Sequence, residues 1–258
     1  LCGALFPMRL GPTDLRRESE DFYVGHTLVA ALNGLYQQIT LELRGRSVDN
    51  LHLAVQAEAA DIVQAFAEEL PSLRVRLDQD VEAAYLGDPA AHSADEVLLC
   101  YPGVLAVIHH RLAHAIYRRG APVVARMLAE IAHSRTGIDI HPGARIGTGF
   151  FIDHGTGIVI GETAVIGENV RLYQAVTLGA RRFTVGASGA LEKGEPRRPI
   201  LEDDVVVYAG ATILGRITVG QGSSIGGNVW LTHSVPPHSI VTQAGVQYAA
   251  VTGVGDGI

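Results

Sequence analysis

The chain has 258 residues, a formal net charge of −7 and 18% charged residues. This balance argues against a nucleic-acid partner, which needs a basic surface, and no apolar run reaches the roughly 18 residues of a membrane-spanning helix. The two cysteines, Cys2 and Cys100, are too few for a disulfide framework, so we expect a reducing, cytoplasmic location.

Apolar residues recur at helical spacing through about residue 137. We expect helices over residues 15–39, 55–70, 77–84, 104–116 and from Pro122 onward. Pro71 is expected to end the second helix, because proline cannot donate the helical hydrogen bond, and Gly120 to follow the end of the fourth. Residues 1–137 are therefore predicted to form an all-α domain.

From Ile138 the spacing of aliphatic residues changes to six. The repeat runs through Ile140, Ile146 and Ile152, then, two residues out of step, through Ile160, Ile166, Leu172 and Leu178, and finally through Leu201, Val207, Ile213, Val219, Ile225 and Leu231. A period of six is typical of a parallel β-helix, in which each short strand turns one aliphatic side chain inward and three strands make one coil. We predict an α+β fold with a helical domain over 1–137, a β-helix over 138–240 and a C-terminal tail over 241–258.

Two interruptions of the repeat are candidate functional segments, since insertions in a solenoid are commonly binding loops. The first is "DHGTGIVI", where Ile152 and Ile160 are eight residues apart instead of six. The second, residues 179–199, has no six-residue spacing and is rich in Gly, Arg and Ser. It is predicted to project from the prism as a loop.

His154 in the first interruption is a candidate general base. Neighbouring side chains in extended backbone point to opposite faces, so Asp153 is not expected to pair with His154. Asp139 precedes His154 by close to one coil of the repeat and is expected on the adjacent rung near it. A carboxylate there would fix the tautomer of the imidazole and stabilise its protonated form. The alternative, an ordinary histidine in a turn, stays open.

The other histidines do not favour a metal site. His141 and His154 could suggest zinc shared across a subunit interface, but their spacing does not repeat and no further histidine falls in register. His110 and His114 share one helix face at i, i+4. Because no carboxylate completes a recognised metal motif with them, we expect them to be packing or surface residues. We therefore expect no metal.

Several segments together resemble bacterial serine O-acetyltransferases. In the repeat these are "GIDIHPGARIG", "DHGTGIVIGETAVIG", "VTLGA", "AGATILG" and "SVPPHS". In the helical half, "GDPAA" at 87–91 is similar to the family's Asp-Pro-Ala segment and "HRLAH" at 110–114 to its Tyr-Arg-x-x-His helix. The resemblance covers roughly residues 80–240.

The resemblance implies a left-handed β-helix that forms trimers, with active sites between neighbouring prisms and with helical domains that pair two trimers into a hexamer. It implies transfer of an acetyl group from acetyl-CoA to the hydroxyl of L-serine, the first step of cysteine synthesis, without a metal. By position, His154 would be the general base and Asp139 its partner.

The same resemblance assigns the binding residues. Asp88 and Asp153 would bind the ammonium group of the substrate, and Arg197 its carboxylate. Backbone groups of four residues would line the channel for coenzyme A: Gly179, Ala180, Ala209 and Gly210.

Arg198 departs from the family pattern, because the projecting loop reads "RRP" where the family has Arg-His-Pro. Arginine is permanently charged and cannot accept a hydrogen bond. We place Arg198 with Arg197 among the substrate-binding residues. Three other readings stay open: an acyltransferase with a different amino-acid or hydroxyl acceptor, a weakly active regulatory partner of cysteine synthase, and a γ-type carbonic anhydrase.

The C-terminal segment "GDGI" ends in isoleucine. In the family a tail of this form can enter the active site of O-acetylserine sulfhydrylase, the next enzyme. The resemblance therefore implies this sulfhydrylase as a partner that binds Ile258.

Overall fold

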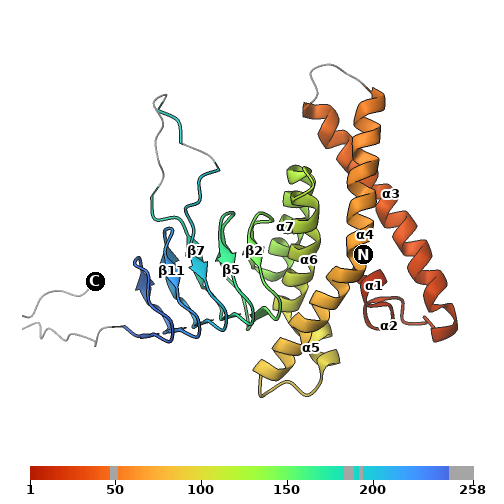
Figure 1. The fold of residues 1–258 in the computed structure, drawn as a ribbon. Helices are drawn as coiled ribbons and strands as arrows, with labels where there is room; N and C mark the ends of the chain where they lie inside the picture. The colour runs from red at the N-terminus through yellow and green to blue at the C-terminus, as the bar shows by residue number, and fades with distance from the viewer. Residues whose placement is uncertain (47–51, 183–188, 192–193, 244–258) are drawn as a thin grey trace, which may run out of the picture.

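The computed structural model describes residues 1–46, 52–182, 189–191 and 194–243. Figure 1 shows a helical N-terminal region followed by a three-sided prism of short strands, with the loop between β7 and β8 projecting from it. Ile258 and part of the loop lie outside the described residues. No helix in the described part of the chain is long and apolar enough to cross a membrane.

The helices of the N-terminal region are mostly those that the apolar spacing predicts. They are α1 (Cys2–Leu5), α2 (Pro7–Leu10), the 3-10 helix η1 (Arg17–Ser19), α3 (Glu20–Arg46), α4 (His52–Gly87), α5 (Ala94–Cys100), α6 (Pro102–Tyr117) and α7 (Pro122–Thr136). Pro122 begins α7 and Gly137 ends it in a left-handed conformation, as helix punctuation predicts.

Pro71 does not end a helix, and this prediction is wrong. It lies inside the 36-residue helix α4, which joins the two predicted segments 55–70 and 77–84. Proline inside a helix costs about 3 kcal/mol. Leu70, Leu73 and Leu77 are buried on either side of it, and each buried side chain of this size contributes about 1.5–3 kcal/mol. Packing therefore keeps α4 continuous through the proline.

Helix α5 has no predicted counterpart, although the sequence carries a start signal for it. The Ser93 hydroxyl accepts a hydrogen bond from the backbone N–H of Glu96, and the Glu96 carboxylate accepts one from the backbone N–H of His92. This reciprocal pair satisfies amide groups that the first turn of a helix leaves unpaired. A seven-residue helix is too short for its apolar spacing to be recognised.

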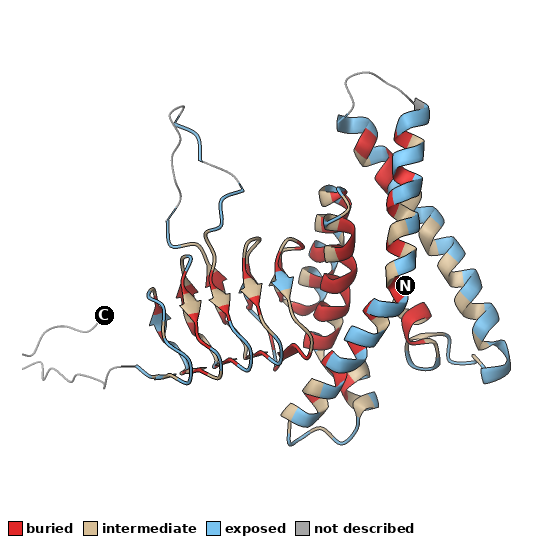
Figure 2. Ribbon diagram, in the orientation of Figure 1, coloured by how far each residue is buried: buried red, intermediate tan, exposed pale blue. Residues whose placement is uncertain are grey.

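The strands stack into three parallel sheets, which form a left-handed parallel β-helix. Sheet A contains β1 (Asp139–Ile140), β4 (Val159–Ile160), β7 (Thr177–Gly179), β10 (Thr212–Leu214) and β13 (Trp230–Leu231). Sheet B contains β2 (Arg145–Ile146), β5 (Val165–Ile166), β8 (Ile200–Leu201) and β11 (Thr218–Val219). Sheet C contains β3 (Phe151–Ile152), β6 (Arg171–Leu172), β9 (Val206–Val207), β12 (Ser224–Ile225) and β14 (Ile240–Val241). The aliphatic residues of the repeat are buried, apart from the partly buried Ile146, as the burial colours of the strands show (Figure 2).

The strand register measures the length of each coil. Val159 pairs with Thr177 and Thr212 with Trp230, a separation of three hexapeptides in each case. Asp139 instead pairs with Val159, two positions beyond three hexapeptides, because the "DHGTGIVI" segment lengthens the first coil. Thr177 pairs with Thr212, almost twice as far along the chain as in a regular coil, because this coil contains the projecting loop.

The two added residues change the corner between sheets C and A. Later coils place one left-handed residue two positions before the strand of sheet A, namely Ala175, Gly210 and Asn228. In the first coil Gly157 takes this place with φ 81°, and His154 is a further left-handed residue with φ 60°. Such a conformation is uncommon outside glycine. The insertion therefore makes a wider corner that carries a histidine.

Helix α6 packs closely on the first coil. A Cβ atom added to Gly103 would lie 2.3 Å from the backbone oxygen of Ile152 and 2.9 Å from its Cβ. Only a residue without a side chain allows α6 to approach β3 this closely, directly beside Asp153 and His154.

We predict that Gly103→Ala lowers the free energy of unfolding by about 1–3 kcal/mol, because the added methyl group separates α6 from β3. Gly34→Ala in α3 is the matched control, since a Cβ there meets nothing within 4 Å, and it is expected to raise stability by up to about 1 kcal/mol. Denaturant unfolding of both variants measures the difference. Equal effects in the two variants would contradict the close packing.

Candidate active site

Asp88, Asp153 and His154 lie where the end of α4 meets the first coil. Asp88 directly follows α4, and a Cβ on Gly87 would lie 3.0 Å from the ring of Phe151. The charge of His154 is near enough to lower the pKa of Asp88, although less than the hydrogen bonds to that carboxyl do. The structure thus brings a residue at the end of the helical region to two adjacent residues of the prism.

Asp88 is held ionised by hydrogen bonds. The Tyr101 hydroxyl donates to Oδ2 of Asp88 at 2.5 Å, and the backbone N–H of Ala90 donates to Oδ1 at 2.8 Å. These two bonds hold the pKa of Asp88 below its usual range, with the tyrosine bond contributing most. The same bond, with burial, raises the pKa of Tyr101 to about 12, so Tyr101 remains a donor.

Asp153 is buried and is bound by Arg171. Nη2 of Arg171 donates to Oδ2 of Asp153 at 2.5 Å, while Nη1 donates to the backbone oxygen of Gly87 at 2.6 Å. The guanidinium lies over the rings of Phe151 and Tyr173, at 4.8 and 4.6 Å from their centres. Arg171 therefore connects Asp153 to the end of α4, and so to Asp88.

His154 projects outward from the corner, with 72% of its side chain exposed. Its Nε2 atom lies 3.8 Å from Oδ1 of Asp153. The prediction that Asp153 does not pair with His154 is therefore wrong. It assumed extended backbone, and the left-handed φ of His154 breaks the alternation of side chains.

The described part of the chain contains no ion pair between Asp139 and His154, so the expected pairing of these two residues stays a prediction. The first coil is longer than a regular one, so the separation between the two residues falls short of a full coil. Asp139 therefore lies on sheet A, and His154 lies at the corner that precedes the next strand of that sheet. The described ion-pair partner of Asp139 is Arg126 of α7, whose Nη2 lies 3.8 Å from Oδ1.

Asp139 also belongs to a group with possible metal-binding atoms, although we expected no metal. One atom each of Glu130, His133 and Asp139 lies within 4.8 Å of the others, and this is the one group of that kind within the described residues. Arg126 already supplies a positive charge there, since its Nη2 is 2.6 Å from Glu130. His141 and His154 are not part of the group.

His141 faces a neighbouring polar cluster. Its Nδ1 accepts a hydrogen bond from the backbone N–H of Gly143, and its ring meets that of Tyr117 edge-on. The Tyr117 hydroxyl donates to Glu162 at 3.0 Å. Burial is the main cause that lowers the pKa of His141, against the charge of Glu162, which raises it.

Arg197 and Arg198 stand where the projecting loop returns to the prism. The hydroxyl of Thr163 accepts hydrogen bonds from both of their backbone N–H groups, at 3.0 and 3.2 Å. The side chain of Arg198 lies against Gly161, where any Cβ would collide with it. Burial, followed by the charge of Arg197, lowers the pKa of Arg198. Arg198 is therefore packed against sheet A near Glu162.

The four residues assigned to coenzyme A lie along sheet A. Gly179 ends β7 and Ala180 follows it, whereas Ala209 and Gly210 form the corner before β10. These pairs lie at opposite ends of adjacent strands. Backbone hydrogen bonds stack both corners on their neighbours, from Gly215 to Gly179 and from Asn228 to Ala209.

Sequence reasoning missed Arg171 and Tyr101. Arg171 follows Asp153 by one regular coil, so the repeat itself contained the signal. Tyr101 lies between α5 and α6, and no pattern pointed to it. Together the corner presents two carboxylates, one of them neutralised by Arg171, beside an exposed imidazole. This arrangement suits binding of a cationic group and transfer of a proton next to it.

No family model matches this chain, whereas several relatives match it along most of its sequence or along almost two thirds of it. A protein named "Serine acetyltransferase, plasmid" from Synechococcus elongatus is 55% identical over 252 residues, which cover 96% of this chain and 79% of the relative. A serine acetyltransferase from Mycobacterium tuberculosis is 49% identical over 162 residues, 63% of this chain and 67% of the relative.

Solved structures agree. Serine acetyltransferase isoform 3 from Entamoeba histolytica, in complex with cysteine, has a TM-score of 0.82 at 36% identity and covers 98% of this chain and 82% of its own. Soybean serine acetyltransferase complexed with serine has a TM-score of 0.62 at 32% identity, with 93% of each chain covered. With more than half of its residues identical to a relative across almost its whole length, this chain belongs to the serine acetyltransferase family.

Proposed function

We propose that His154 is the general base in the reaction of this family, transfer of the acetyl group of acetyl-CoA to the hydroxyl of L-serine to give O-acetyl-L-serine. The observation that carries the proposal is the corner where an exposed imidazole stands beside Asp88 and Asp153. Asp88 and Asp153 bind the substrate ammonium, which orients the serine hydroxyl toward His154.

The proton balance uses His154 twice. The imidazole takes the hydroxyl proton while the serine oxygen forms a bond to the thioester carbonyl carbon. When the carbon–sulfur bond breaks, the imidazolium returns this proton to the departing thiolate. The two carboxylates, which accept hydrogen bonds from Tyr101 and Arg171, bind the ammonium group, and the exposed imidazole of His154 takes the hydroxyl proton.

Arg197 stands at the corner between sheets A and B, whereas His154 stands at the corner between sheets C and A, and we propose that a neighbouring copy brings Arg197, with Asp139, to His154. The absence of an ion pair between Asp139 and His154 among the described residues supports this arrangement, as does the exposure of His154. Closed trimers supply such a contact three times by symmetry. Asp139 then orients His154, and Arg197, with Arg198 behind it, binds the serine carboxylate.

Other parts of the proposal rest on the family resemblance. Gly179, Ala180, Ala209 and Gly210 would hold coenzyme A through backbone groups along sheet A. The contact of Ile258 with O-acetylserine sulfhydrylase and the pairing of trimers into a hexamer stay predictions. A cytoplasmic location is supported by the two free thiols, Cys2 and Cys100.

We predict that His154→Asn lowers kcat for serine by about 10²- to 10⁴-fold, the usual contribution of a positioned general base. Asparagine tolerates the left-handed conformation but is not basic. His238→Asn is the matched control, because His238 is another exposed corner histidine with φ 57°, and its kcat should be unchanged. Release of free thiol from acetyl-CoA measures both. Turnover of another hydroxyl or amino acceptor, but not of serine, would overturn the assignment of the substrate.

We predict that inactive His154→Asn and Asp139→Asn chains regain activity when they are co-expressed or refolded together. When the two chains assemble at random from equal amounts, about one site in four combines a native His154 face with a native Asp139 face. Mixing His154→Asn with Asp153→Asn, two changes on one face, is the control and should stay inactive. No recovery in the first mixture would place both residues in a site within one chain.

We predict that Tyr101→Phe raises the pKa of Asp88 toward its usual value, because the variant loses the strongest hydrogen bond to the ionised carboxyl. A lowered pKa in the folded state stabilises the protein above the unfolded pKa, and this contribution is lost as the pH falls through the folded pKa. Asp88 of the variant should also take up a proton at a higher pH than Asp88 of the parent. Because a neutral carboxyl does not attract the ammonium group, serine binding should be lost at that higher pH. A carboxyl NMR titration measures the shift, with Tyr85→Phe as control; an unchanged Asp88 would refute the role of Tyr101.

A further inference from the structure

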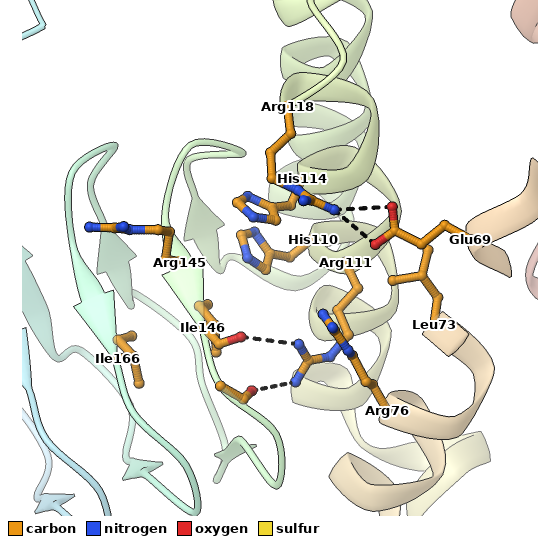
Figure 3. A pocket seen from close by; sticks show the side chains of 11 residues that line it. Glu69, Leu73, Arg76, His110, Arg111, His114, Arg118, Arg145, Ile146 and Ile166 are labelled. Atoms are coloured by element: carbon orange, nitrogen blue, oxygen red, sulfur yellow. Dashed lines mark hydrogen bonds and ion pairs between the residues drawn. The ribbon is translucent and has the colours of Figure 1, made fainter. Parts of the chain in front are cut away.

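A cavity of about 350 Å³ lies between α4, α6 and the first strands of sheet B, and none of the proposed catalytic residues lines it. Figure 3 shows His110 and His114 of α6 on one side of it and Glu69 and Leu73 of α4 on the other. The segment "HRLAH" contributes both histidines, and the proposed reaction uses neither. The volume of the cavity is in the lower range of small-molecule sites.

Positive charge is in excess around this cavity, although the whole chain carries −7. Glu69 bonds to both Arg118 and Arg119, which leaves one positive charge over in that group. Arg111 is neutralised by the buried Asp80. Arg76 lines the cavity and has no described ion-pair partner. A concave surface of one sign concentrates the potential and attracts counter-ions.

His110 supplies a second, independent observation. Its side chain is buried, and Nδ1 has no hydrogen-bond partner in the described structure, whereas Nδ1 of His114 meets the backbone oxygen of Pro142 at 2.7 Å. Burial, with the nearby His114 and Arg111, holds the pKa of His110 well below its usual range, so the ring is neutral and carries one N–H. A buried polar atom without a partner is unfavourable, and a hydrogen bond to a ligand oxygen or hydroxyl would offset that cost.

We propose that this cavity binds a small oxoanion, a phosphate or sulfate group that is either free or the head of a small ester. Arg76 and Arg118 hold the charged oxygens, for which guanidinium geometry is well suited. His110 hydrogen-bonds to the same group from the inner wall. Leu73 and Ile146 give the body of an ester an apolar surface. The site is separate from the catalytic corner and does not depend on the roles proposed for it.

Calorimetric titration of the full chain tests the proposal, at constant ionic strength set with chloride. The probes are inorganic phosphate, inorganic sulfate and phenyl phosphate. We expect saturable binding of phosphate or sulfate. Tighter binding of phenyl phosphate would identify an ester as the better ligand, and equal binding would identify the free anion. If none of the three binds beyond the chloride background, the proposal is wrong.

Arg76→Gln should weaken binding about tenfold, since one charge-assisted bidentate contact is lost. Arg145→Gln is the matched control: Arg145 also borders the cavity, but its side chain points away from it in Figure 3. Both arginines are exposed, so neither variant should unfold. Equal affinity of the two variants would overturn the site, and so would a raised KM for acetyl-CoA in Arg76→Gln, which would make the cavity part of the co-substrate site.

Glu69→Gln provides a test in the opposite direction. The change removes the carboxylate from the wall and frees Arg118, so phosphate should bind several-fold more tightly. Nitrogen NMR of the histidine rings gives a direct readout, because phosphate should shift the Nδ1 signal of His110 and leave that of His233, an exposed histidine on the far coils, in place. Weaker binding in a folded Glu69→Gln variant, or an unmoved His110 signal at saturation, would contradict the proposal.

Discussion

The arrangement of the two halves of the molecule depends on one buried ion pair. Arg111 of α6 donates two hydrogen bonds to Asp80 of α4, at 2.5 and 2.7 Å, and both side chains are almost fully buried. Arg111 also donates to the backbone oxygens of Ile146 and Gly147, and Asp80 accepts from the backbone N–H of Phe150. A buried pair of this kind adds little net stability over an apolar packing, but removing one partner costs about 3–5 kcal/mol. Its contribution is to fix one position of the helices on the first coil.

That position determines where the end of α4 lies. Asp80 is two helical turns before Gly87, so the same helix that is fixed at Phe150 carries Asp88 to the corner of β3. Arg171 fixes the corner again from the next coil, through Gly87 and Asp153. The carboxylates of the proposed site are thus held by two arginines in series, while His154 remains exposed. A carboxylate pair held by several hydrogen bonds beside an exposed imidazole fits a site that a second copy completes.

Much of the fold followed from the spacing of aliphatic residues, because a prism repeats one physical requirement in every coil. Each inward Ile, Leu or Val must stack on the one below, so the period of six, the two added residues before Ile160 and the projecting loop were all predictable. Pro71 was not, since the burial of Leu73 and Leu77 that outweighs its cost depends on contacts outside the helix. The exposed His154 was predictable from the insertion, but the absence of an ion pair with Asp139 in the described chain was not. Asp139 and His154 are less than one coil apart, because the same insertion that carries His154 lengthens the first coil.

Arg198 stands where the resemblance to the family leads us to expect histidine, and the prism wall next to it accommodates the longer side chain. Its side chain lies on the backbone of Gly161, a position of the repeat where any side chain would exclude it, and Thr163 binds the backbone of both loop arginines. The charge of Glu162 partly offsets the burial of the guanidinium. Glycine, glutamate and threonine thus follow one another along a single turn of the chain, and each meets a different part of the returning loop. Because Tyr117 of α6 bonds to the same Glu162, the helical region that places Asp88 also supports the loop end that carries Arg197. The two faces that we propose to meet between copies are therefore supported by the same helical region within each copy, through α4 and α6.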